Sequence, residues 1–190
     1  MAARDLPLLE VHDRAGLRTW LVSNHAASRG VRVAVTKKGG SATSLTYEDA
    51  VLEALSFGWI DSTAGRLDAE RSTVAFGPRK RGGTWARTNK DRIGRLSAEG
   101  RMTPAGLAVV DAAKADGSWT ALDDVEALVT PPDLEAALAA EPGAAEGFAA
   151  RSASQRKIAL GHISEAKREE ARARRVSEVV RAVAKGRRFH

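Results

Sequence analysis

The segment from Gly117 to Pro132 divides this sequence into two parts with different patterns. It contains Trp119, an acidic cluster and two consecutive prolines, a composition typical of a connector. Before it, apolar residues recur with the periods of both strands and helices, whereas the remainder is helical in pattern. We therefore expect an α+β body over residues 1–117, an acidic linker over 118–132 and a C-terminal helical unit over 133–188.

Strand-type patterns in the body predict a small, mostly antiparallel sheet. Residues 59–62 and 72–76 are expected to pair antiparallel through the turn-rich segment between them. Val31 to Val35 alternates with the period of a half-buried strand. Leu6 to Val11 contains Pro7, which has no backbone donor, so this short strand is expected at an edge of the sheet.

Helices are expected to pack on this sheet, and several of their starts carry capping signals. Thr46 and Thr103 each precede an apolar run at the position of a helix cap. In the last helix Glu170 is placed to pair with Arg174. That helix also has an apolar stripe formed by Val176, Val179, Val180 and Val183. The expected helices cover about residues 13–27, 46–58, 84–99, 103–117, 134–140 and 165–185.

The composition limits the chemistry open to the chain. With no cysteine, it excludes disulfides, thiolate nucleophiles and Cys-ligated metal centres. The four histidines show no metal-binding spacing, and no Gly-x-Ser-x-Gly elbow is present, so we expect no metal and no cofactor. We find no signal-type segment and no apolar run long enough to span a bilayer, which predicts a cytoplasmic location without a transmembrane segment.

Charge is unevenly distributed along the chain. The formal net charge is +6, which favours phosphates, anionic lipids or acidic proteins as partners. Residues 116–150 contain no Lys or Arg but several carboxylates, and they lie between a basic zone at 66–101 and a basic tail at 151–188. The simplest interpretation is internal complementarity, with the acidic segment lying against a basic face.

The first candidate site is the Phe-Gly-Trp-Ile-Asp run. Strand residues two apart point the same way, so Trp59 and Asp61 are expected to share a face. In a structural interpretation Trp59 fills the core and Asp61 caps a turn or pairs with an arginine. In a functional interpretation Asp61 lies at the rim of a pocket and orients a polar ligand, or acts there as a catalytic acid or base.

The second candidate site is the basic, glycine-rich stretch from Phe76 to Trp85. Its glycines would let a partner approach the backbone, and the following helix start could help its cations hold an anion. No Walker loop is present, and a solvated basic loop tied to Asp61 and the acidic connector is the commoner structural explanation. The candidate ligand-binding residues of both sites are Trp59, Asp61, Arg79, Lys80, Trp85, Asn89 and Arg92.

Several motifs in this order resemble the YdeI/OmpD-associated, or bacteriocin-protection, family: Ala-Leu-x-Phe-Gly-Trp-Ile-Asp-Ser, Phe-x-Pro-Arg-Lys…Trp…Asn-Lys, Gly-Arg-Met-x-Pro-Ala-Gly and Ala-Lys-Arg-Glu-Glu-x-Arg. The resemblance spans nearly the whole chain and implies a bacterial protein linked to envelope stress and antimicrobial-peptide resistance, with an envelope protein as a possible partner. Ser56 stands where the family often has Cys, and Gly83, Ala86 and Ala171 replace hydroxyl residues. These departures favour binding over catalysis.

Three functions follow from these patterns. The leading hypothesis is a non-catalytic binding protein that takes a small anionic ligand or peptide at the two candidate sites. The second is a nucleic-acid-binding protein that uses the basic 79–92 surface and the C-terminal helix. The third is an enzyme with Asp61 as acid or base and Arg79 as an anion clamp.

Overall fold

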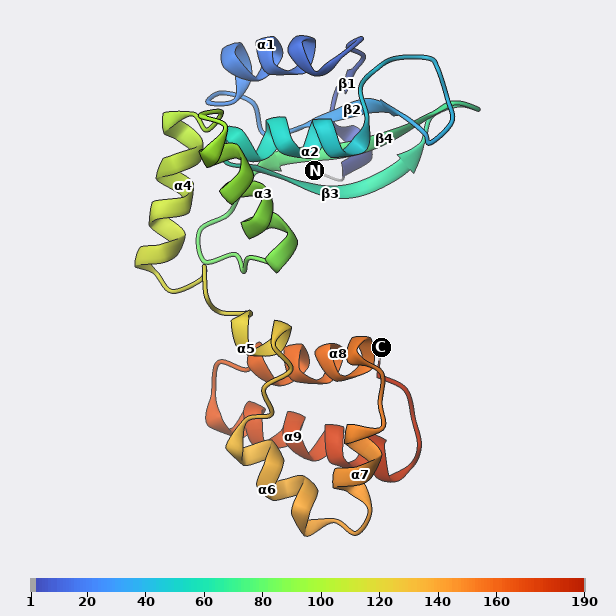
Figure 1. The fold of residues 1–190 in the computed structure, drawn as a ribbon, viewed down its shortest axis with the longest axis vertical. Coiled ribbons are helices and arrows are strands. Elements are labelled where there is room, and N and C mark those ends of the chain that lie inside the picture. The colour runs from blue at the N-terminus through green and yellow to red at the C-terminus, as the bar shows by residue number, and fades with distance from the viewer. Residues whose placement is uncertain (1–2, 190) are drawn as a thin grey trace. The chain divides into compact units, whose positions relative to one another are not determined.

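The computed structural model describes residues 3–189, so the first two residues and His190 lie outside the described part. The chain forms two compact units, which are divided between Trp119 and Thr120. The first unit is a sheet with helices and the second is helical throughout its elements, which confirms the expected α+β class (Figure 1). Within the described residues, no helix is both long enough and apolar enough to cross a membrane.

The N-terminal unit contains one sheet with strand order β1-β2-β4-β3. The predicted antiparallel pairing of β3 with β4 is confirmed, and β4 also pairs antiparallel with β2. Strand β1 lies at the predicted edge but runs parallel to β2, so the sheet is mixed. After a 3-10 turn at Ala3–Asp5, the elements are β1 (Leu8–Leu9), α1 (Arg14–Asn24), β2 (Val31–Thr36), α2 (Tyr47–Ser56), β3 (Trp59–Arg66), β4 (Arg71–Pro78), α3 (Arg87–Ala98) and α4 (Pro104–Ala115).

Local signals explain where α2 and α4 begin and where α2 ends. The Thr46 hydroxyl accepts a hydrogen bond from the Asp49 amide at 3.1 Å, and Thr103 caps α4 in the same way. After α2, Gly58 adopts a φ of 76°, which only glycine enters at little cost. A Cβ at Gly58 would also lie 2.7 Å from a methyl carbon of Val109, so this tight turn into β3 requires glycine.

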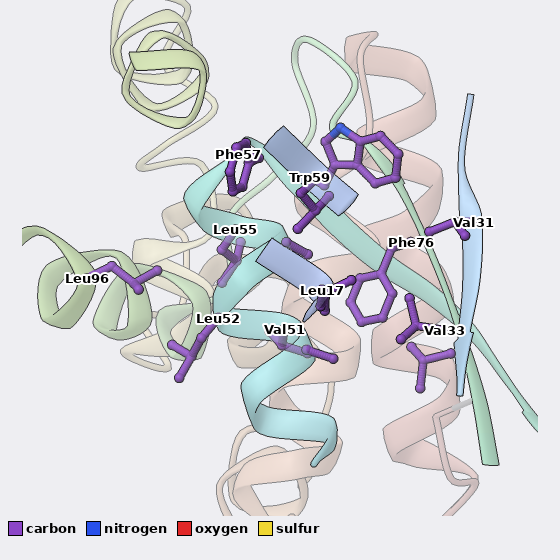
Figure 2. Close-up of a cluster of buried hydrophobic side chains, with 14 of the residues drawn as sticks. Leu17, Val31, Val33, Val51, Leu52, Leu55, Phe57, Trp59, Phe76 and Leu96 are labelled. Carbon is purple, nitrogen blue, oxygen red and sulfur yellow. The ribbon is translucent and has the colours of Figure 1, made fainter. Parts of the chain in front are cut away.

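The core of the N-terminal unit lies where the sheet meets α1 and α2. Figure 2 shows Phe76 and Val33 of the strands together with Leu17 and Val51 of the two helices, and all four are buried. The alternation in β2 predicted one buried face only. Ala34 is nevertheless 1% exposed, so β2 is covered on both sides and the half-buried prediction is wrong at this residue.

The C-terminal unit is a bundle in which α9 packs against α6, α7 and α8. The predicted valine stripe of the last helix is confirmed, because all four valines are buried in the second core. Val125 and Leu128, from the segment predicted as a linker, also pack against that core. The helices are α5 (Asp123–Glu126), α6 (Pro132–Ala140), α7 (Ala144–Ala149), α8 (Ala153–Ser164) and α9 (Glu169–Ala184).

Ion pairs connect the acidic segment with the basic tail inside this unit. Lys157 of α8 donates to Glu126 of α5 at 2.5 Å. Arg172 of α9 forms two hydrogen bonds with Asp133 of α6, at 2.6 and 2.9 Å. The expected internal complementarity of charge therefore holds for these two pairs.

Cations of the last helix also find partners close by. The spacing predicted Glu170 as the partner of Arg174. Arg174 instead lies 3.7 Å from Glu178, one turn later in the chain. Arg175 donates to the carbonyl oxygen of His162 at 2.5 Å. Much of the positive charge of α9 is thus balanced within its own unit.

The pair between Asp133 and Arg172 predicts a pH effect. Hydrogen bonding by Arg172 lowers the pKa of Asp133 below its ordinary 3.8, so the carboxylate stabilises the folded state above that pH. This contribution is lost as the pH falls through the lowered pKa. Because both side chains are more than a third exposed, it should stay below about 1 kcal/mol. Urea unfolding followed by circular dichroism should show an Asp133→Asn deficit at pH 7 that shrinks as the pH is lowered below 3.8, and a deficit that stays the same size would contradict this.

Candidate functional site

The loop between β4 and α3, residues 79–86, is held at both ends. At its start the Arg79 amide donates to the Gly58 carbonyl oxygen at 3.0 Å, which ties the end of β4 to the turn before β3. At its end Trp85 is 1% exposed and packs against Trp119, with ring centroids 4.9 Å apart. The basic residues between these anchors therefore occupy a fixed position on the unit.

Arg79 is the cation of this loop that is partly buried, whereas Lys80 and Arg81 are exposed. Its guanidinium lies 3.7 Å from the centroid of the Trp85 ring and donates to the Thr84 carbonyl oxygen. Its Nε is buried without a hydrogen-bond partner, and no carboxylate of the described residues lies within 4 Å of its nitrogens. Burial lowers the pKa of Arg79, because water is withdrawn from the charged form.

A cavity of about 170 Å³ lies beside this guanidinium. Arg79, Lys80 and Arg81 form its basic side, and Trp85 contributes the indole ring. The opposite wall comes from α4 and the residues that follow it, namely Ala108, Val109, Ala112, Ala113, Asp116 and Ser118. The sequence predicted an anion site formed by this loop and the start of α3, whereas the cavity is completed by α4.

Asp116 fixes the loop on the α4 side of the cavity. Its carboxylate accepts a hydrogen bond from the Ser118 amide at 3.0 Å and another from the Gly82 amide. The hydrogen bonds from Ser118 are the main cause of its lowered pKa, and Arg81 adds a smaller Coulombic effect. Asp116 is therefore an ionised carboxylate in the cavity lining that already accepts hydrogen bonds from the protein.

The residues of the first motif do not line this cavity. Trp59 is 2% exposed in the core, where its indole nitrogen donates to the His25 carbonyl oxygen at 3.3 Å. Asp61 instead accepts a hydrogen bond at 2.8 Å from the hydroxyl of Tyr47. Partial burial and, after it, this bond to Asp61 raise the pKa of Tyr47.

Asn89 and Arg92 belong to a surface network with α2. Arg92 binds Glu48 through two hydrogen bonds, at 3.0 and 2.5 Å, and the first cause of the lowered pKa of Glu48 is this contact. Arg92 also donates to the Asn89 side-chain oxygen at 2.9 Å. Of the seven residues proposed from sequence, Arg79, Lys80 and Trp85 are brought together at the cavity, and the other four are not.

A buried carboxylate that sequence analysis missed lies in α2. Glu53 is fully buried, and its oxygens accept hydrogen bonds from Arg14 at 2.5 Å, Arg18 at 2.8 Å and Arg101 at 2.5 Å. Every residue of α2 from Ala50 to Ser56 is buried, so a glutamate within this apolar run was the available signal. Because three arginines already bind the oxygens of Glu53, this carboxylate stabilises the fold and is not available to bind a ligand.

A larger hollow, of about 670 Å³, lies between α6 and α9. Its floor is formed by alanines and valines, and the Asp133–Arg172 pair on its rim is already bonded. None of the buried side-chain nitrogens that lack a hydrogen-bond partner lines this hollow. Although this hollow is larger, it offers a ligand no buried polar group without a partner, unlike the cavity beside Arg79.

Comparison with family profiles gives one match within each of the two structural units. Residues 9–109 match a family described as a domain of unknown function, DUF8412. Residues 127–186 match the family described as "Bacteriocin-protection, YdeI or OmpD-Associated". The family named from the motifs is thus confirmed over the C-terminal unit and not over nearly the whole chain. Comparison with curated proteins and with solved structures gave no match.

Proposed function

We propose that this chain, which belongs to the DUF8412 family and carries a C-terminal unit of the bacteriocin-protection family, is a non-catalytic protein that binds an anionic ligand beside Arg79. The observation that carries the proposal is the poorly compensated guanidinium at the cavity wall. A partly buried guanidinium whose Nε has no hydrogen-bond partner, and which has no carboxylate of the described residues within 4 Å, destabilises the free protein. An anion in the cavity would supply an opposite charge and a hydrogen-bond acceptor.

The neighbouring cations support an anion as the ligand. Lys80 and Arg81 line the same cavity and are exposed, so they would attract a negative charge from solution. Arg79, held against Trp85, would then form the short-range contact. Trp85 is held by Trp119, so the proposed site needs little rearrangement when the ligand enters.

Both alternatives from the sequence have weaker support. Nucleic-acid binding through α9 would use cations such as Arg172 and Arg174, which are paired with carboxylates. An enzyme using Asp61 with Arg79 would need both groups at one cavity, but Asp61 does not line the one beside Arg79. We therefore retain binding as the leading function.

Removal of the Arg79 charge should abolish most anion binding. Charge-assisted hydrogen bonds contribute about 1.5–3 kcal/mol, so Arg79→Gln should weaken binding about 10- to 100-fold. Isothermal titration of the wild type and variant with acetate, benzoate, inorganic phosphate and an acidic peptide measures this. Arg87→Gln is the matched control, because Arg87 is exposed and does not line the cavity. Equal affinity of both variants for every bound anion would reject the site.

The C-terminal match suggests where such binding would matter. We extend the proposal to a bacterial cytoplasmic protein that contributes to protection against bacteriocins, in line with the description of that family. Deleting the gene should lower survival in bacteriocin, and wild-type or Arg87→Gln protein should restore it better than Arg79→Gln. Survival that is unchanged by the deletion would contradict this role without affecting the binding proposal.

A further inference from the structure

The lining of the cavity beside Arg79 also restricts which anion it can take, provided that the proposed anion binding is correct. Phosphate sites are usually built from several free backbone N–H groups at a glycine-rich loop. Here the Gly82 amide donates to Asp116, and the Gly83 amide donates to the Lys80 carbonyl oxygen at 3.3 Å. The two glycine amides that could have held a phosphate are therefore already used.

The start of α3 offers no substitute for those amides. None of its first residues, 87–90, lines the cavity, and the amides of Asn89 and Lys90 already donate to the Ala86 carbonyl oxygen, at 3.0 and 3.2 Å. A ligand in the cavity would be held chiefly by the guanidinium of Arg79.

One charge of the lining governs the charge of the ligand. Lys80, Arg81 and Asp116 are exposed, so water and salt screen their charges. Arg79 is the partly buried member of these four charged residues, so it provides the least screened charge that a ligand meets in the cavity. A single carboxylate is enough to neutralise that guanidinium.

The remainder of the lining favours an apolar body. Trp85 supplies one aromatic wall, and the side chains of α4 that reach the cavity are small and apolar: Ala108, Val109, Ala112 and Ala113. The volume of about 170 Å³ is close to the roughly 150 Å³ of a protein cavity that holds benzene. One ring, or an aliphatic group of the same size, can thus be accommodated.

From these features we infer that the ligand is a monocarboxylate whose apolar body, about one ring in size, lies between Trp85 and the alanines of α4 while its carboxylate binds Arg79. Such chemistry has two sources. One is a free aromatic or branched aliphatic acid, and the other is the C-terminal carboxylate of a peptide that ends in an apolar residue.

Titration of the full chain with matched probes tests this inference. Benzoate should bind at least ten times more tightly than inorganic phosphate, acetate and the neutral analogue benzamide. Acetylated Ala-Phe with a free carboxylate, compared with its amide, distinguishes the peptide source from the free acid. Binding of benzoate alone assigns a free acid, and tighter binding of the peptide carboxylate assigns a chain end.

Filling the cavity gives a second, independent result. Ala112→Leu should weaken benzoate at least tenfold and leave the weaker acetate unchanged, because only the space for the apolar body is lost. Ala115→Leu, on the exposed end of α4 outside the lining, is the control. Preferential binding of phosphate, or benzoate binding that Ala112→Leu does not change, would overturn the inference while leaving anion binding in place. If none of these anions binds the wild type, the proposed function fails as well.

Discussion

Replacing Glu53 by glutamine should lower the free energy of unfolding of the N-terminal unit by about 3 kcal/mol. The carboxylate is fully buried and bonded to Arg14, Arg18 and Arg101. An amide of the same shape removes the negative charge and leaves three guanidinium groups facing one another. Removing one partner from a buried ion pair costs about 3–5 kcal/mol, and we expect the lower end because the arginines are 21–35% exposed and can regain water.

Tryptophan fluorescence during urea unfolding measures this loss selectively, because all four tryptophans belong to the N-terminal unit. Glu48→Gln is the matched control on the same helix. Its ion pair with Arg92 is partly exposed, so the control should lose less than about 1 kcal/mol. If Glu53→Gln is no less stable than Glu48→Gln, the buried cluster does not support the fold as we describe.

The second large effect is expected for Gly106→Ala. Gly106 lies in the first turn of α4, where this helix packs against the end of α2. A Cβ there would overlap the Ser56 carbonyl oxygen and lie 2.8 Å from its carbon, and both are backbone atoms that cannot rotate away. Thr103 also donates to that oxygen, so separating the helices would break its hydrogen bond. We expect a net loss of at least about 2 kcal/mol, because overpacking outweighs the gain of up to about 1 kcal/mol in helix propensity.

Gly94 provides the matched control, since it lies inside α3 with no atom within 4 Å of a built Cβ. Gly94→Ala should therefore stabilise the unit by about 0.5–1 kcal/mol. The same fluorescence experiment compares both variants. Opposite signs are predicted, and stabilisation by both substitutions would contradict the close packing of α2 and α4.

The elements that could be predicted from the sequence are those with a local chemical signal. Thr46 and Thr103 cap helices as expected. Each hydroxyl binds an amide only three residues later in the sequence, so the contact does not depend on distant parts of the chain. The antiparallel pair β3 and β4 was predicted from neighbouring apolar runs. Its strands extend into residues 63–71. The sequence predicted a turn there, because the exposed half of the hairpin lacks apolar alternation.

Features that depend on distant residues could not be predicted in this way. The parallel direction of β1 follows from the path of α1 and not from any pattern within Leu8–Leu9. Arg101 and Glu53 are 48 positions apart, and their contact requires the folded unit. The candidate site could be predicted only in part for the same reason. Arg79 and Trp85 were predicted because they belong to a basic and aromatic motif. The α4 wall consists of alanines, such as Ala112, whose residue type carries no functional signal.

The claim that a carboxylate binds beside Arg79 is tested most directly by two-dimensional NMR of side-chain N–H groups during a benzoate titration. The account predicts that the Nε–H signal of Arg79, now buried without a partner, and the indole signal of Trp85 shift together and saturate at one affinity. The indole signals of Trp20 and Trp59 in the core should stay in place. Saturable shifts elsewhere, with Arg79 and Trp85 unchanged, would contradict it.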